Sequence, residues 1–543
     1  MNFKANESKQ KLRGGYYTPL DLAVFLTKWI CEINPKNVLE PSCGDGIFFE
    51  ALSRINGPSN IAATAFEIDK NEALRAKKRA ERFKINTEVY PTDFLAWSIK
   101  KMISGDLPFD AVLGNPPFIR YQYLPEGFQE NTEEIFNLLN LPFTKHTNAW
   151  VPFILASIAL LKPGGRLAMV IPSEIIHIPY AQSLRTYLGK ECHKIVIIDP
   201  QELWFEDTLQ GAVLLLAEKK QEHQDTEGLG IYPVRNREFL DLDPYRIFSA
   251  PKSINGKTVE GKWTRALLDL ETRTLLDKLS EHPRIFRFKD IADVDVGIVT
   301  GANNYFLIND EVVAKFRLSK WIYPMFGRSE HCPGVIYNEK QHQENIKNGK
   351  PTNFVWFKDK SAQNDPAAKA YISYGKKQNL HTRYKCRTRN LWYSVPSVYS
   401  TEIGMLKRAH DTPRLIFNKI SAFTTDTAYR IKSRIKPERL VGSFINSLTA
   451  LSTEIEGRHY GGGVLELVPS EIERLLIPLP HQVSTSVGDL DHSIRSMPIE
   501  NVLSLQDGRI LKGLGLSRVS QQQLFNAWSE LRNRRQRVSS DLN

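Results

Sequence analysis

The chain has 543 residues, of which 41% are hydrophobic and 24% are charged, so we expect a soluble globular protein with two or three domains. Its longest apolar run, residues 150–161, is shorter than the roughly 20 residues needed to cross a bilayer, and the polar N-terminus lacks the apolar stretch of a secretion signal. These features exclude a membrane protein, and we expect a cytoplasmic one. The five scattered cysteines indicate neither a disulfide framework nor a zinc site, and the formal net charge of +11 favours a polyanionic partner.

The first segment that suggests chemistry is Gly-Gly-Tyr-Tyr-Thr-Pro at residues 14–19. Its Gly-Gly and Thr-Pro pairs predict a bent, exposed loop, and residues 21–30 then have the spacing of an amphipathic helix. Taken by itself, this segment is equally typical of a helix-capping turn with buried tyrosines.

A predicted strand at residues 37–40, a glycine-containing loop at 41–46 and a helix at 47–54 follow. This layout holds a nucleotide-like ligand over the N-terminus of a helix. Phe49 stands where a dinucleotide-binding loop has its third glycine, and Glu40 at the strand end would repel phosphates but suit an amino group. The alternative is an ordinary turn between a strand and a helix.

Two further predicted strands end in polar residues that suit a nucleoside. Residues 61–66 lead to Glu67, which is placed to accept from a ribose diol. Residues 87–90 lead to Asp93 and Phe94, which could accept from an adenine amine and pack on its ring. Asp93 could also cap the helix after it, and the two roles are compatible.

The sequence Asn115-Pro116-Pro117-Phe118 follows a short buried strand at residues 111–114. Two prolines fix the backbone and remove two donors, so the loop presents carbonyl acceptors. The side-chain carbonyl of Asn115 and the Pro116 carbonyl could accept the two N–H groups of an aromatic amine, with Phe118 against its ring. A simple turn after a strand is the alternative.

The remaining elements of this half complete a sheet. Helices are predicted at residues 148–161 and 180–188, and strands at 166–171, 194–199 and 211–218. The pattern predicts a seven-stranded α/β sheet whose last strand is antiparallel, followed by a polar linker at 219–228.

Six segments together resemble the gamma-class, TaqI-like adenine-N6 DNA methyltransferases: GGYYTP (14–19), VLEPSCGDGIFF (38–49), AFEID (65–69), TDFLAW (92–97), GNPPF (114–118) and LLKPGGRLAMVIPS (160–173). The resemblance covers residues 14 to about 220 well and the rest weakly. It implies a Rossmann-like class I S-adenosylmethionine methyltransferase domain at residues 1–225, a mixed α+β DNA-recognition domain at 230–480 and a helical tail at 481–543.

The resemblance also implies a role for individual residues. The methionine end of the cofactor would be held by Tyr17, Thr18, Pro19, Glu40, Ser42 and Gly44, its ribose by Glu67, and its adenine by Ile68, Asp93 and Phe94. Asn115 and Pro116 would hold the target amine, and Phe118, in place of a commoner tyrosine, would stack on the base. Phe205 would pack against the flipped base, with a buried hairpin as the alternative for its mostly apolar segment.

The implied activity is transfer of a methyl group from S-adenosylmethionine to adenine N6 in double-stranded DNA by base flipping, without a metal. The protein would protect host DNA in a restriction–modification system. A cognate restriction endonuclease would act on the same site without needing to bind this chain, which we expect to be a monomer.

The second half carries a basic run. Between residues 381 and 440 there are 13 Lys or Arg against four Asp or Glu, interleaved with aromatic residues, which favours a groove that contacts phosphates over an ordinary basic surface. The other function considered is a protein glutamine-N5 methyltransferase, which shares the Asn-Pro-Pro-aromatic loop. Those chains are shorter and lack such a second half, so the domain content favours DNA.

Overall fold

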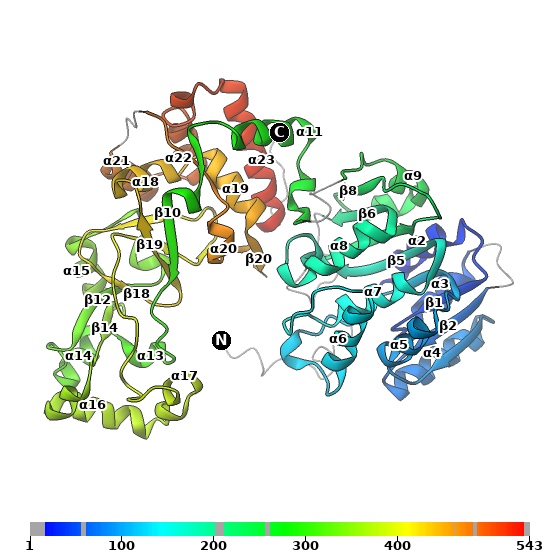
Figure 1. Ribbon diagram of the computed structural model, residues 1–543, viewed down its shortest axis with the longest axis horizontal. Coiled ribbons are helices and arrows are strands. Elements are labelled where there is room, and N and C mark those ends of the chain that lie inside the picture. Colours follow the sequence, from blue (N-terminus) through cyan, green and yellow to red (C-terminus); the bar gives the residue numbers. More distant parts are fainter. Residues whose placement is uncertain are drawn as a thin grey trace. The chain divides into compact units, whose positions relative to one another are not determined.

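The computed structural model describes residues 17–55, 61–200, 211–255, 261–460, 462–481 and 486–536 (Figure 1). The chain divides into two compact units, Met1–Leu267 and Leu268–Asn543, here called unit 1 and unit 2. Among the described residues, no helix is both long and apolar enough to span a membrane.

Unit 1 is built on one sheet with the strand order β3-β2-β1-β4-β5-β7-β6-β8. Its strands are β1 (Asn37–Glu40), β2 (Ala62–Phe66), β3 (Asn86–Tyr90), β4 (Phe109–Gly114), β5 (Leu161–Pro172), β6 (Cys192–Pro200), β7 (Ala212–Lys219) and β8 (Gly228–Val234). Neighbouring strands are parallel except that β7 runs antiparallel to both β5 and β6. The predicted α/β sheet with a late antiparallel strand is confirmed.

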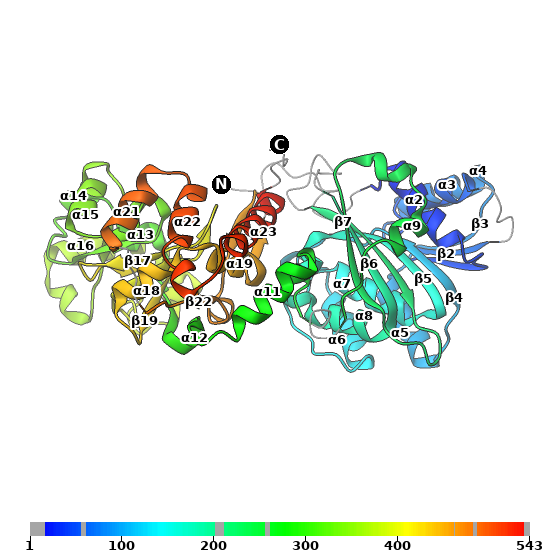
Figure 2. The ribbon, with the colours of Figure 1, turned by 90° about the horizontal axis from the view of Figure 1, so that it is seen from above.

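Helices cover both faces of this sheet (Figure 2). One face carries α2 (Leu20–Cys31), α3 (Ile47–Ser53) and α9 (Pro244–Ser249), and the other carries α5 (Phe94–Ser104), α7 (Trp150–Ala159) and α8 (Gln182–Glu191). Because both faces are covered, the central strands are almost continuously apolar, and residues 213–217 of β7 are fully buried. This arrangement places the core on either side of the sheet and leaves its strand ends for a site.

The sheet has one strand more than the sequence predicted. The segment that begins at Gly228 pairs with β6 from Lys194 to Pro200, so the expected linker at 219–228 ends in an eighth strand, β8. Its glycines and Pro233 weakened the strand signal, but proline is tolerated there because β8 is an edge strand.

Unit 1 also extends further than residue 225. Phe248 of α9 lies 5.0 Å from Trp29 of α2, measured between ring centroids, so the segment after β8 packs on the same core.

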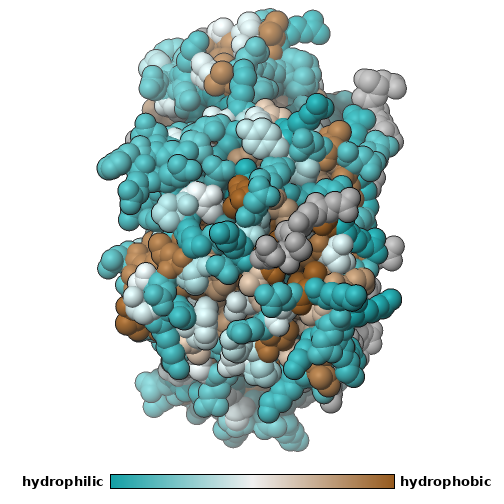
Figure 3. All heavy atoms as spheres, turned by 90° about the vertical axis from the view of Figure 1, so that its right-hand side faces the viewer, coloured by the Kyte–Doolittle hydropathy of each residue, from teal (hydrophilic) through white to brown (hydrophobic). Residues whose placement is uncertain are grey.

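On the face shown in Figure 3, apolar side chains form small separate groups among hydrophilic ones.

Unit 2 is mixed α+β. Its five-stranded sheet contains β10 (Ala292–Val296), β19 (Ala428–Ser433), β15 (Ile403–Leu406), β17 (Leu415–Asn418) and β13 (Ile336–Tyr337), in that order. A four-stranded sheet contains β11 (Leu307–Ile308), β14 (Asn353–Val355), β12 (Ile322–Phe326) and β18 (Phe423–Thr424). Strand β9 (Ile285–Arg287) pairs with β22 (Leu476–Pro478), which joins the early and late parts of the unit.

The last helices are part of unit 2 and not a separate tail. They are α21 (Val487–Ser496), α22 (Ile499–Asp507) and α23 (Arg518–Gln536), and α23 packs along α19 (Ser447–Glu456). Arg535 of α23 forms a salt bridge with Glu454 of α19 at 2.8 Å, and both side chains are fully buried. The described residues of the tail predicted at 481–543 therefore belong to unit 2. Part of the positive charge near its end, that of Arg535, is buried in a salt bridge.

Candidate functional site

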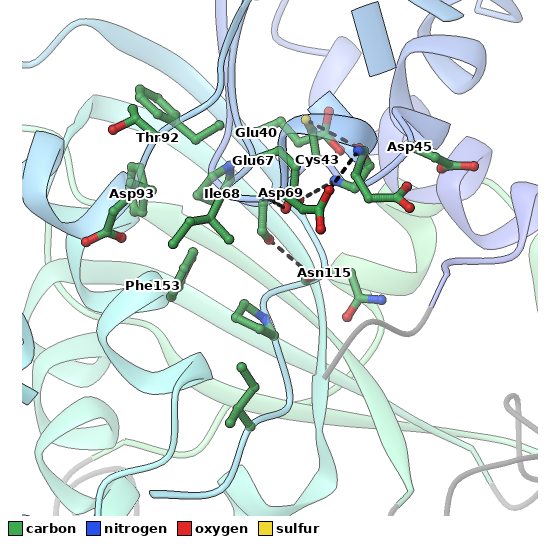
Figure 4. Close-up of a pocket in the computed structure, with 18 of the residues that line it drawn as sticks. Glu40, Cys43, Asp45, Glu67, Ile68, Asp69, Thr92, Asp93, Asn115 and Phe153 are labelled. Carbon is green, nitrogen blue, oxygen red and sulfur yellow. Dashed lines mark hydrogen bonds between the residues drawn. The ribbon is translucent and has the colours of Figure 1, made fainter. Parts of the chain in front are cut away.

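A cavity of about 830 Å³ lies at the carboxyl ends of β1, β2 and β4 in unit 1 (Figure 4). The ends of these strands contribute Glu40, Glu67 and Asn115 to its lining. Parallel α/β sheets bind ligands at this edge, so the structure brings together the strand ends that the sequence singled out.

The lining is strongly acidic. It includes seven carboxylate residues and one basic residue, Arg75; the acidic ones are Glu40, Asp45, Glu67, Asp69, Glu72, Asp93 and Glu126. Such a lining disfavours a phosphorylated ligand and favours one that carries positive charge.

Glu40 is the most deeply placed of these carboxylates, with 3% of its surface exposed. Burial raises its pKa well above the usual range, the nearby charges of Asp45 and Glu67 raise it further, and Arg79 opposes them. Arg79 is already paired with Asp45 at 3.0 Å. A cationic ligand group beside Glu40 would therefore favour its charged form.

Glu67 holds two loops at once. Its carboxylate accepts from the Gly44 N–H at 3.0 Å and from the Asp69 N–H at 2.9 Å. Burial raises the pKa of Glu67, whereas these two hydrogen bonds lower it. Each carboxylate oxygen can accept more than one hydrogen bond, so Glu67 can also take the ribose hydroxyls for which it was predicted.

Two glycines give the loop after β1 its shape. Gly44 has φ +52° and lines the cavity, and apart from its chain neighbours no atom of the described residues lies within 4 Å of the position that a Cβ would take there. At Gly46, with φ +83°, a Cβ would lie 2.7 Å from the Phe49 ring. The phenylalanine that replaces a third glycine is thus a buried packing partner of Gly46, and the loop still leaves open space for a ligand.

One end of the cavity combines apolar side chains with the polar Thr92, Asp93 and Asn131. Figure 4 shows Ile68, Asp93 and Phe153 at this end, and Phe94 also lines it. Ile68 is 67% exposed and lines the cavity, so a flat ring could cover it. The adenine-binding roles of Ile68 and Phe94 stay predictions.

Asp93 does cap the following helix, as its alternative role required. Its carboxylate accepts from the backbone N–H groups of Leu95 at 3.0 Å and Ala96 at 3.3 Å. It also accepts from the side-chain amide of Asn131 at 2.9 Å. The role of Asp93 toward adenine stays a prediction.

Three separate motifs meet at Asn115. Its side-chain amide donates to the Thr18 hydroxyl at 3.1 Å, and its backbone carbonyl accepts from the Ser42 hydroxyl at 3.1 Å. Tyr17 also lines the cavity, whereas Pro19 is the residue at which α2 is capped and does not line it. The side chain of Asn115 is therefore held in one orientation at the edge of the cavity.

The rest of the proline loop is divided between the cavity and the core. Pro117 lines the cavity, Pro116 is buried, and Phe118 packs against the core on the α2 face of the sheet. Phe118 does not line the cavity. Phe205 lies outside the described residues.

The segment that follows this loop also lines the cavity, which its sequence did not predict. Residues 119–131 include the start of α6 (Phe128–Leu138) and contribute Ile119, Pro125, Glu126, Gly127, Phe128 and Asn131 to the lining. The Pro-Glu-Gly turn directly before a helix was the available signal, since Gly127 has φ +76° there.

The sheet order and the acidic cavity define a class I S-adenosylmethionine-dependent methyltransferase. A model of the Eco57I restriction-modification methylase family matches residues 45–205, and a model of the C-terminal domain of Type II methyltransferase M.Eco57I matches residues 260–511. The chain is a methyltransferase of the Type II restriction–modification kind, with S-adenosylmethionine as its cofactor. The predicted family resemblance and cofactor are confirmed.

Similar proteins align along most of the chain. Type II methyltransferase M.AccI of Acinetobacter calcoaceticus is 24% identical over 482 residues, which cover 84% of each protein. Type II methyltransferase M.XamI of Xanthomonas campestris pv. amaranthicola is 22% identical over 475 residues, covering 86% of this chain and 85% of that protein. In fold, the chain resembles the cryo-EM structure of a DrdV–DNA complex, with a TM-score of 0.50 and 11% identity, over 92% of this chain and 58% of that one.

Proposed function

We propose that this site-specific DNA methyltransferase acts on adenine N6 in double-stranded DNA, on a target base that has left the helix stack. The observation that carries the proposal is the fixed position of Asn115 at the edge of the cavity, between the hydroxyls of Thr18 and Ser42. The glutamine-N5 alternative is not favoured, because both family models describe restriction–modification methylases.

The residues around Asn115 suit a weakly nucleophilic amine. S-adenosylmethionine supplies an electrophilic methyl group when it is bound. The lone pair of an exocyclic adenine amine is delocalised into the ring, and acceptors that take its N–H groups favour the pyramidal nitrogen that reacts. Since the Asn115 amide nitrogen donates to Thr18, the orientation of the side-chain oxygen is fixed before the base arrives.

The base must leave the duplex to reach this loop, at a cost of a few kcal/mol that stacking can offset. Phe118 is partly exposed even though it packs against the α2 face, so its ring can still contact a base. Stacking by Phe118 and packing by Phe205 are parts of the proposal.

Unit 2 is proposed to recognise the DNA target. Its short helix α17 (Tyr384–Arg387) and the residue before it expose three cations, Arg383, Lys385 and Arg387. Tyr384 between them is 66% exposed. Exposed cations around an exposed aromatic ring suit contacts with the phosphates and bases of DNA. We further propose that the protein acts as a monomer and needs no bound endonuclease.

The test is to identify the methylated base. Unmethylated duplex DNA is incubated with the protein and S-adenosylmethionine carrying a labelled methyl group, and the DNA is digested to nucleosides for mass spectrometry. We expect the label in N6-methyldeoxyadenosine. Label in a methylated cytosine would overturn the adenine assignment, and label in protein glutamine alone would overturn the substrate class.

A further inference from the structure

A short series of hydrogen bonds lies beside the segment that follows Asn115–Phe118. The Tyr121 N–H donates to the side-chain oxygen of Asn148 at 3.0 Å. The Asn148 amide nitrogen donates to the Tyr180 hydroxyl at 2.6 Å and lies 3.4 Å from a carboxylate oxygen of Glu174. The Tyr180 hydroxyl in turn donates to Glu174. None of Asn148, Glu174 and Tyr180 lines the cavity.

The direction of these bonds fixes the orientation of Asn148. Burial and the charge of Glu174 both raise the pKa of Tyr180 well above its usual range, so this hydroxyl keeps its proton. Because that proton is donated to Glu174, the hydroxyl oxygen accepts from the Asn148 amide nitrogen. The oxygen of Asn148 must then point the other way, toward the Tyr121 N–H.

Asn148 and its neighbour hold the chain on the C-terminal side of the proline loop. Besides the bond from Tyr121, the Ala149 N–H donates to the Ile119 carbonyl at 3.0 Å. On the N-terminal side, β4 belongs to the sheet and Ser42 holds the Asn115 carbonyl. Both flanks of the loop are therefore fixed, and its two prolines leave little freedom between them.

The segment that carries Glu174 and Tyr180 is itself held from α8. The fully buried Arg185 donates to the Ile175 and Ile178 carbonyls, each at 2.9 Å, and to the Gly261 carbonyl at 2.7 Å. Burial lowers the pKa of Arg185 to about 9, which still leaves it charged near neutral pH. Glu174 and Tyr180 thus have a rigid base from which to orient Asn148.

We infer that Asn148, oriented by Tyr180 and Glu174, is a positioning residue that sets where Asn115 and Pro116 stand when the target amine arrives. The inference rests on the proposed function, since it assumes that Asn115 receives the amine. A displacement of about 1 Å can cost about 100-fold in rate when a reaction depends on positioning. A buried polar series that does not line the cavity therefore has a direct consequence for transfer.

The test compares Asn148→Ala, Tyr180→Phe and the double variant, with saturating DNA and S-adenosylmethionine. Each single variant should lower kcat at least about tenfold, with the KM for DNA and the Kd for the cofactor within about threefold of the parent. The double variant should lose no more than about threefold beyond the worse single variant, because both act through one series of bonds.

Two controls separate positioning from stability. Tyr187→Phe removes the hydroxyl of another buried tyrosine, which lies in helix α8 directly after the turn that carries Tyr180, and should leave kcat within about twofold. Glu174→Gln keeps an acceptor for Tyr180 and should retain more activity than Glu174→Ala. Unchanged kcat in Tyr180→Phe, or additive losses in the double variant, would overturn the inference.

The failure of this inference can be distinguished from failure of the proposed function by identifying the product in the same reactions. A methylated cytosine product together with the predicted kcat losses would refute only the adenine assignment. N6-methyladenine formed at the parental rate by all three variants would refute only the role of Asn148.

Discussion

Buried carboxylates are found in both units, but their surroundings differ. In unit 1, Glu40 is 3% exposed and has Asp45 and Glu67 as charged neighbours, which raise its pKa as burial does. In unit 2, Glu454 is fully buried and accepts from the Arg535 guanidinium at 2.8 and 2.9 Å. Burial raises the pKa of Glu454 too, but Arg535 acts against it.

The difference distinguishes a binding site from a core. Burying a charge is costly, and a core compensates it with a partner from the chain itself. Glu40 has no such partner: its carboxylate neighbours are Asp45 and Glu67, and the nearby Arg79 is already paired with Asp45, so a ligand can bring the positive charge that Glu40 lacks. A sulfonium and an amino group supply that charge.

The basic residues of unit 2 show the same division. Arg389 donates to the Val299 carbonyl at 2.8 Å and to the Thr300 carbonyl at 2.9 Å, and Arg430 donates to the Ser397 carbonyl at 2.8 Å. Burial lowers the pKa of both guanidinium groups. The predicted groove therefore loses these two residues to internal structure, while the exposed cations at 383–387 remain candidates for binding phosphates.

The largest effect is expected at Asn115, where catalysis and cofactor binding should separate. Asn115→Ala removes the amide but none of the carboxylates, so transfer should fall by more than about 100-fold while the cofactor Kd changes little. Calorimetry and a single-turnover assay measure the two quantities. Asn131→Ala, at the other end of the cavity, should instead raise the cofactor Kd and change the rate of transfer little. Transfer within about tenfold of the parent would contradict the role of Asn115.

The next effect tests whether the basic residues of unit 2 divide into exposed ones that bind DNA and internal ones that stabilise the fold. Replacement of Arg383, Lys385 and Arg387 together by Ala should weaken DNA binding more than about tenfold. It should also flatten the dependence of log K on log[salt] by about 0.9 for each phosphate that the protein no longer neutralises. Titration of duplex DNA at several salt concentrations gives this slope.

Arg389→Ala is the matched control for this change. It removes one cation of the same run, but one that donates to backbone carbonyls, so it should lower the melting temperature of the protein and leave the salt slope unchanged. The division would be wrong if the triple variant kept the parental slope, or if Arg389→Ala flattened it without loss of stability.

A smaller effect should appear at Glu40, and it should depend on pH. The pKa of Glu40 is raised, so its carboxyl is increasingly protonated as pH falls and then resembles glutamine. In the parent, cofactor affinity should increase with pH as the carboxyl ionises. Glu40→Gln cannot ionise, so the gap between the two proteins should grow with pH to about tenfold. Calorimetry at a series of pH values below about 7.5, where an α-amino group keeps its proton, tests this, and a gap that does not change with pH would exclude Glu40 as the partner of a cationic group.

The unit 1 sheet and the cofactor side of the site could be predicted because local patterns coincide there with topology. Glu40, Glu67 and Asn115 each follow an apolar strand, and parallel strands bring such ends to one edge. Asn131 and Phe153 could not be found in this way, because they reach the cavity from helices whose placement depends on packing.

Other features depended on interactions that sequence patterns do not show. β8 contains two glycines and a proline and becomes a strand by pairing with β6. An exposed and a structural arginine cannot be distinguished within a basic run of the sequence. Arg389 donates to backbone carbonyls, whereas Arg387 is exposed. The described part of the predicted tail joins unit 2 through Glu454, which lies 81 residues before Arg535.

The smallest effect concerns Asp507, a buried carboxylate of unit 2 that is not part of the cavity lining. It accepts from the Ser447 N–H at 2.8 Å and from the Ser447 hydroxyl, yet burial raises its pKa from 3.8 to about 6. Because the folded pKa is the higher one, the carboxyl stabilises the fold below pH 4, and this contribution is lost as pH rises toward 6 and above. Between pH 5 and 7 the free energy of unfolding of the parent should therefore fall by about 1 kcal/mol relative to Asp507→Asn, which does not titrate. Urea unfolding of both proteins at each pH measures the difference. A constant difference across this range would mean that Asp507 is as well compensated as Glu454.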